Sequence, residues 1–313
     1  MNDWLPNFTN EIQRLLGYSP TTAKAYTSDV NRFLDYLARY RGKHILTDRI
    51  DAEDVTAFLA YEVSQGRRRT TLHRRLAALR VLERYLLLTN QLIAPFVPKD
   101  ANVLQTLLES KPSRATTCLQ TEDLQRLWQT LLQSPKRQAV RDLALIALIA
   151  EWGFPISLLL SLTIDNIDLD ERLLWVPQIT GRQIAWELER SYGPVARYLK
   201  HGRQDLAPKA DVQHLFISQQ GRPLSRQSVW HSLRTWGQAA GLSTPLTPRV
   251  LRNTAAYRLL RSGYSPQAIG QALGHSNPLS TTLLIRRLYQ YCGDKPPAEI
   301  PEYPTPDETN TEA

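Results

Sequence analysis

Apolar residues recur at helical spacing through most of the first hundred positions. Between Ser19 and Tyr40 they fall on one face, and Ser19 followed by Pro20 is a typical N-cap with proline in the first turn. The same pattern predicts helices over 51–64 and 66–88, the last with leucines on one face and arginines on the other. We therefore expect an all-helical first domain over residues 1–93.

The helical pattern breaks between Ala94 and Pro112, where three prolines surround a short apolar run. Proline interrupts both helices and sheets, so residues 94–115 are interpreted as a linker with room for one helix.

Helical spacing returns after the linker, over 121–132, 141–153, 225–241, 249–262 and 266–273. Residues 166–189 alternate instead, which predicts two strands joined by a turn at Thr180–Gly181, and HLFIS (214–218) predicts a third short strand. The fold class is thus mainly α, with a small three-stranded sheet in a second domain over 116–293. Prolines and acids dominate the tail, residues 294–313, which we expect to be disordered.

Charge favours a polyanionic partner. The 38 lysines and arginines outnumber the 30 acids, giving a net charge of +8 and a pI near 9.5. Most of these cations are arginine, which suits phosphate recognition, although a genome rich in G and C gives the same bias. No apolar run is long enough to span a membrane, and the start does not resemble a secretion signal. The two cysteines, Cys118 and Cys292, lie far apart in the sequence, so we expect a reducing cytoplasmic setting without a metal site or cofactor.

The third predicted helix carries the densest positive charge. Seven arginines and a single acid, Glu83, lie between positions 67 and 84. Arginine, threonine hydroxyls and first-turn amides are all donors to DNA phosphates, whereas a merely solvated helix face is the alternative. The predicted DNA contacts here are Arg67, Arg68, Arg69, Thr70, Thr71, Arg74 and Arg75.

Four stretches of the chain, in the same order, resemble the tyrosine recombinases of the phage integrase family. TPRVLRNT (247–254) followed by LGHS (273–276) is similar to the family pattern TPHxLRHT…LGHSS…TT…Y, and 141–170 resembles its first motif. Residues 19–37 are similar to the N-terminal core-binding domain. The resemblance covers about residues 10–290. It implies a helical, SAM-like core-binding domain, a tyrosine-recombinase catalytic-type domain, and double-stranded DNA as partner.

The family reaction, implied by the resemblance, uses a tyrosine that attacks a DNA phosphodiester. Two arginines stabilise the charge on the phosphate, a lysine on the hairpin protonates the leaving oxygen, and histidines assist. Of these six positions, Arg252 and His275 are retained. The other four are changed: Pro155 stands for the first arginine, Ile179 for the lysine, Arg249 for a histidine, and Leu284 or Ile285 for the tyrosine.

The candidates for a displaced nucleophile are Tyr289 and Tyr291, which follow His275 by 14 and 16 residues. However, an extra helical turn moves a side chain by about 5 Å, and proline offers no donor in place of the arginine. The predicted DNA contacts of the second domain are Arg182, Arg226, Arg249, Arg252 and His275. The alternatives are a surface role for Arg249 and a backbone-capping role for His275.

Three functions remain in view. The favoured one is a DNA-binding, catalytically inactive-looking member of the family, derived from a mobile element or accessory to recombination or integration, which clamps duplex DNA between its two domains. Its further partner would be an active recombinase or a second copy of the chain. The alternatives are an active site-specific recombinase that uses Tyr289 or Tyr291, and a scaffold that keeps only protein–protein contacts.

Overall fold

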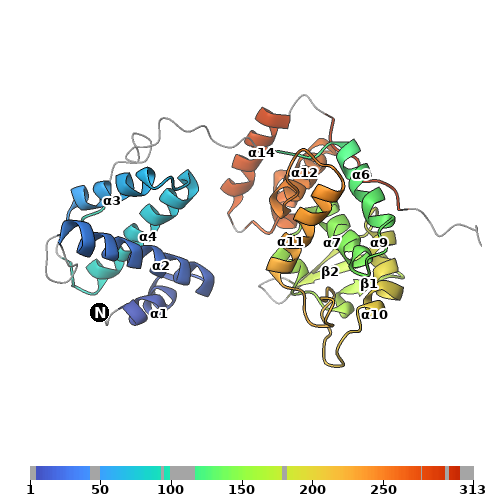
Figure 1. The fold of residues 1–313 in the computed structure, drawn as a ribbon, viewed down its shortest axis with the longest axis horizontal. Coiled ribbons are helices and arrows are strands. Elements are labelled where there is room, and N and C mark those ends of the chain that lie inside the picture. The colour runs from blue at the N-terminus through green and yellow to red at the C-terminus, as the bar shows by residue number, and fades with distance from the viewer. Residues whose placement is uncertain are drawn as a thin grey trace, which may run out of the picture. The chain divides into compact units, whose positions relative to one another are not determined.

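The computed structural model describes residues 5–42, 50–92, 95–98, 117–177, 182–275, 277–292 and 296–303, with only the backbone at Leu5, Pro6 and Tyr291. The chain divides into two compact units, Met1–Ser113 and Arg114–Ala313 (Figure 1). The linker predicted over 94–115 lies almost wholly outside the described residues.

The first unit is helical, as predicted. It contains α1 (Leu5–Leu16), α2 (Pro20–Tyr36), the π-helical turn η1 (Leu37–Arg41), α3 (Ala52–Ser64) and α4 (Arg69–Leu88). Ser19 caps α2, since its hydroxyl accepts from the Thr22 amide at 3.3 Å, and Asp51 caps α3 in the same way. Helix α1 was not predicted, although Phe8 and Ile12 bury its apolar side against the other helices. The Phe33 and Phe58 rings meet in this core with centroids 5.3 Å apart.

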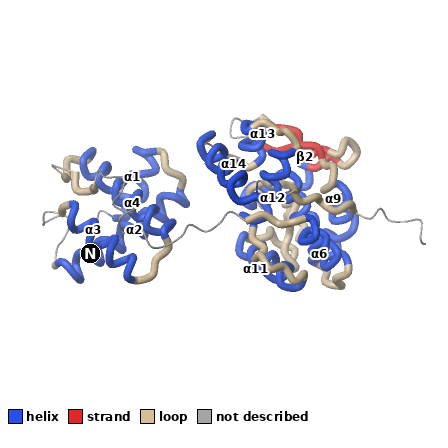
Figure 2. The backbone as a smooth tube through the Cα atoms, turned by 90° about the horizontal axis from the view of Figure 1, so that it is seen from above, coloured by secondary structure: helices blue, strands red, loops and turns tan. Residues whose placement is uncertain are grey.

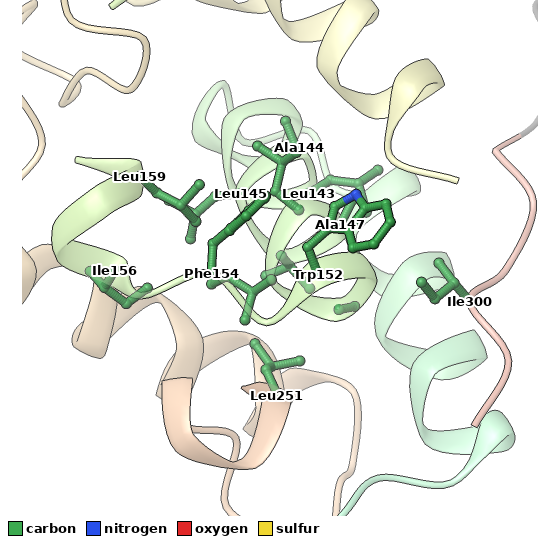
Figure 3. Packing of buried hydrophobic residues seen from close by; sticks show 14 of the residues in the cluster. Leu143, Ala144, Leu145, Ala147, Trp152, Phe154, Ile156, Leu159, Leu251 and Ile300 are labelled. Carbon is green, nitrogen blue, oxygen red and sulfur yellow. The ribbon is translucent and has the colours of Figure 1, made fainter. Parts of the chain in front are cut away.

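The second unit is built around α7 (Gln138–Trp152), a helix buried along nearly its whole length. Around it lie α6 (Thr121–Leu132), α8 (Ile156–Leu159), α9 (Tyr192–Arg197), η3 (Tyr198–Gly202), α10 (Arg203–Asp205), α11 (Arg226–Ala239), α12 (Pro248–Arg261), α13 (Pro266–Ala272) and α14 (Pro278–Cys292). Figure 3 shows the apolar residues of α7 facing Phe154 and, from α12, Leu251. Helix α7 ends at Gly153, whose φ of 74° is left-handed and favours glycine.

The three-stranded sheet is antiparallel, in the order β1-β2-β3, and lies at the opposite edge of the unit from α11 in Figure 2. Its strands are β1 (Ile167–Asp168), which follows the short turn η2 (Ile164–Asn166), β2 (Leu173–Pro177) and β3 (Gln183–Glu187), with Trp175 opposite Ala185. The predicted turn at Thr180–Gly181 lies outside the described residues.

The prediction that 214–218 is the third strand is wrong. Its backbone bonds to other loops instead, with the Leu215 amide donating to Leu162 O at 2.8 Å and Phe216 O accepting from Leu224 at 3.1 Å. Leu215, Phe216 and Ile217 are all buried in the core, so this run is apolar because it is enclosed and not because it alternates in a sheet.

The prediction that the tail is disordered is also wrong for residues 296–303. Ala298 and Ile300 are buried in the core of the second unit, and Figure 3 shows Ile300 beside α6. The Glu299 amide donates to the Thr121 hydroxyl at 3.1 Å, and the Tyr303 hydroxyl accepts from Arg197 at 3.0 Å. Two apolar side chains within a polar, proline-rich composition are enough to dock this segment. Within the described ranges, no helix is long and apolar enough to cross a membrane.

Candidate nucleic-acid interface

A hollow of about 570 Å³ opens on the surface of the second unit, between α8, α11, α12, α14 and the turn before His275. It collects six of the residues singled out in the sequence, namely Pro155, Arg226, Arg249, Arg252, His275 and Leu284. Trp230, Ser280 and Arg287 are further lining residues that the motifs did not indicate. The elements that carry the family motifs thus converge on one place.

The hollow is positively charged and holds no acid. Its lining includes four arginines and one histidine, with neither aspartate nor glutamate. Arg226, Arg249 and Arg287 are exposed, and none of them forms an ion pair with another residue of the described ranges. Unpaired guanidinium groups around an open hollow are a site for an anion with several acceptor oxygens.

Arg252 is the fixed member of this group. Its Nε donates to the carbonyl of Gly153 at 2.9 Å, and an Nη donates to the carbonyl of Leu273. These bonds tie α12 to the end of α7 and to the turn before His275. Burial lowers the pKa of Arg252 from its ordinary value.

His275 is held by α14. Its Nδ1 lies 2.9 Å from the Thr281 hydroxyl, and its amide donates to Gly270 O at 2.9 Å. Burial and, after it, the positive charge of Arg252 lower the pKa of His275. The imidazole is therefore neutral at neutral pH and becomes cationic only in acid.

Pro155, which the resemblance predicts to stand in place of the first family arginine, brings an apolar ring to the hollow. It precedes α8 and packs against the turn before His275. A methyl group added to Gly274 of that turn would lie 2.9 Å from Pro155 Cγ. The backbone at Gly274 is in the left-handed region, with φ at 63°. Glycine is therefore favoured there both by its conformation and by the lack of space for a side chain. This corner of the hollow contributes no hydrogen-bond donor from the side chain.

Helix α14 buries the positions where the family tyrosine is expected. Leu284 and Ile285 are half-buried and pack against the hydrophobic core. Tyr289 lies four residues beyond Ile285, about 6 Å along the helix axis, is 53% exposed and does not line the hollow. The side chain of Tyr291 and the whole of Ile179 lie outside the described residues, whereas Arg182 is exposed just before β3.

In the first unit, acids from neighbouring helices neutralise three of the seven arginines in the basic stretch. Arg74 donates to both oxygens of Asp29 at 2.7 and 3.0 Å, Arg67 lies 3.6 Å from Glu62, and Arg75 is paired with both acids. Arg75 is also buried and cannot reach a partner in solution. The stretch looked uncompensated because α2 and α3 supply its acids through tertiary contacts.

The arginines that remain form a stripe along α4. Arg69, Arg80 and Arg84 are exposed and fall on one side of the helix, since eleven residues, from 69 to 80, are close to three turns. Arg68 and Thr70 are exposed at its start, and Thr71 is half-buried. Arg80 and Arg84 were not among the DNA contacts predicted from the sequence, although the eleven-residue spacing between Arg69 and Arg80 indicates the stripe.

A helical first unit joined to a second unit with a small sheet and a basic hollow is the architecture of a tyrosine recombinase. The chain belongs to the phage integrase family, whose model matches residues 117–289, while the model of the phage integrase N-terminal SAM-like domain matches residues 5–90.

The relatives are named as recombinases. Tyrosine recombinase XerD of Shewanella oneidensis is 29% identical over 277 residues, covering 88% of each chain, and tyrosine recombinase XerC of a Roseiflexus species is 26% identical over 291 residues, covering 92% and 90%. Among solved structures, XerH site-specific recombinase bound to palindromic difH substrate matches with a TM-score of 0.67 at 18% identity, over 93% of this chain and 83% of that one. A lambda integrase dimer bound to a COC′ core site matches with a TM-score of 0.63, also at 18% identity, over 91% and 94%. At these identities the structural likeness establishes the fold.

Proposed function

We propose that this protein binds double-stranded DNA through the hollow and the α4 stripe and does not cut it. The observation that carries the proposal is the composition of the hollow, which combines arginines without counter-ions with apolar side chains, Pro155 and Leu284, at two positions the reaction requires. Such a protein serves as an accessory or regulatory subunit in recombination or integration.

Binding follows from the unpaired cations. Each exposed guanidinium that meets a phosphate releases condensed counter-ions from the duplex, which drives association without reading sequence. The basic groups lie on both units, on α4 of the first and around the hollow of the second. Each unit therefore contributes phosphate contacts to a duplex.

Cleavage requires a hydroxyl held in line with the phosphorus and a donor for the leaving oxygen. Leu284 lines the hollow and has no hydroxyl, while Tyr289 is exposed to solvent and does not line the hollow. Position 249 carries an arginine in place of the family histidine, and a guanidinium donates hydrogen bonds to phosphate but does not serve as an acid–base group as an imidazole does.

The proposal is tested with two measurements on one duplex. Mobility shift at low salt detects binding, and a nicked version of the duplex, which loses a short fragment after attack, detects a covalent protein–DNA adduct. We expect retardation without an adduct, and identical behaviour of the Tyr289→Phe/Tyr291→Phe double variant.

The other outcomes identify the competing functions. An adduct that disappears in the double variant would show an active recombinase with a displaced nucleophile. Absence of retardation at low salt would instead show a scaffold that no longer binds DNA.

A further inference from the structure

The two cysteines of the chain, 174 residues apart in sequence, meet in the folded second unit. Cys118 Sγ and Cys292 Sγ are 2.9 Å apart, compared with about 2.05 Å in a disulfide bond. Both are present as thiols. Their separation in sequence gave no indication of this contact, because it is the fold that brings the segment before α6 against the last residue of α14.

We propose that Cys118 and Cys292 form an intramolecular disulfide, an oxidation site that fastens the end of α14 to the start of the second unit. The site is independent of whether the protein binds or cuts DNA. Because these are the chain's two cysteines, no other thiol of the same molecule competes for either one.

Exposure sets the order of the reaction. Cys118 is half-buried, whereas Cys292 is 5% exposed, so a small-molecule disulfide reaches Cys118 first. The Cys118 thiolate attacks one sulfur of that oxidant, forms a mixed disulfide and releases one small thiolate. The Cys292 thiolate then attacks the Cys118 sulfur and releases the second small thiolate. The protein loses two electrons and two protons, and the oxidant gains them.

The bond would join α14, which borders the hollow, to a segment that is hydrogen-bonded to α12, a second helix of the lining. The Leu119 amide donates to the Thr254 hydroxyl at 2.9 Å, and Asn253 donates to Thr117 O at 3.3 Å, so the segment around Cys118 is fixed to α12. Cys292 ends α14, which carries Leu284 and Arg287 into the hollow. Oxidation therefore links the end of α14 covalently to the segment before α6, which hydrogen bonds hold on α12, and α14 should open less often.

The test uses the full chain in buffers with defined ratios of reduced to oxidised glutathione. We expect the titratable thiols to fall from two to none under denaturing conditions, with a mass loss of two hydrogens and a cross-linked peptide pair containing positions 118 and 292. Retained glutathione adducts on both cysteines, or a disulfide-linked dimer, would overturn the proposal.

The fastening of α14 is tested by amide hydrogen exchange, with the two single cysteine variants as controls. Amide hydrogen exchange in α14 should be slower in the oxidised wild type than in the reduced one, and unaffected by oxidant in Cys118→Ser and Cys292→Ser. Equal exchange in oxidised and reduced wild type would refute the fastening of α14 even if the bond forms. DNA binding is not part of either readout, so failure here leaves the proposed function untouched.

Discussion

The salt dependence of DNA binding can be worked out from the arginines that have no acidic partner. On α4 and in the lining of the hollow, six exposed arginines meet this condition: Arg69, Arg80 and Arg84 on the helix, and Arg226, Arg249 and Arg287 around the hollow. With about 0.9 counter-ions released per phosphate contact, six contacts give a slope of about −5.4 in log affinity against log salt. Raising salt from about 50 to about 200 mM should weaken binding roughly 2,000-fold.

Replacing Arg249 with alanine removes one of these contacts. We expect the slope to become less steep by about 0.9, and affinity at low salt to fall similarly for all duplex sequences, because a phosphate contact carries no base information. Fluorescence anisotropy of a labelled duplex over a salt series gives both quantities.

The matched control is Arg126→Ala. Arg126 is also exposed, but its guanidinium is paired with Asp123 at 2.6 Å, so its loss should leave the slope unchanged. The reasoning fails if Arg249→Ala keeps the wild-type slope, or if Arg126→Ala reduces it as much.

Four further predictions concern catalysis, stability and pH. Pro155→Arg should still give no covalent adduct on nicked duplex, because Leu284 supplies no hydroxyl; an adduct would show that a tyrosine elsewhere is competent. Glu151→Ala should lower the free energy of unfolding of the second unit by about 3 kcal/mol, measured by denaturant titration, because the 3%-exposed carboxylate accepts from the amides of Glu189, Arg190 and Ser191; the exposed Glu171→Ala is the control. Ile300→Ala should cost about 2 kcal/mol in the same titration, and no change would mean that the C-terminal segment does not dock. Because the pKa of His275 lies below its ordinary value, the free imidazole is neutral at neutral pH, and a bound phosphate favours its protonated form. Wild-type affinity for DNA should therefore rise as pH falls below about 6.5, by no more than about tenfold per pH unit, whereas His275→Gln should lose this increment.

Local patterns predicted most helices well. Ser19 with Pro20 marks the start of α2, and the helices predicted from residues 51 and 249 begin within one residue of α3 and α12, because capping is decided by neighbours in sequence. The buried α7 was likewise evident from its uniform apolar composition. The run at 214–218 was misassigned because a short buried segment has the same composition whether or not it joins a sheet.

The family motifs predicted part of the hollow's lining. They indicated Arg226, Arg249, Arg252 and His275, which the fold brings to one hollow, but not Arg287, which reaches it from three residues beyond Leu284 on α14. Arg75 shows the opposite failure, because its partners Asp29 and Glu62 come from other helices. Ion pairs between helices depend on the tertiary structure, so the spacing of charges along one helix does not predict them.

The packing of Leu284 and Ile285 against the core has a consequence for how this lineage changes over time. In a cutting relative that region of the helix is constrained by chemistry, which tolerates a single amino acid at the reacting position. Here the same positions fill space, so natural variants should exchange leucine, isoleucine, valine and methionine freely while excluding polar residues. Under the proposed function such exchanges cost no activity, because neither position supplies a reacting group.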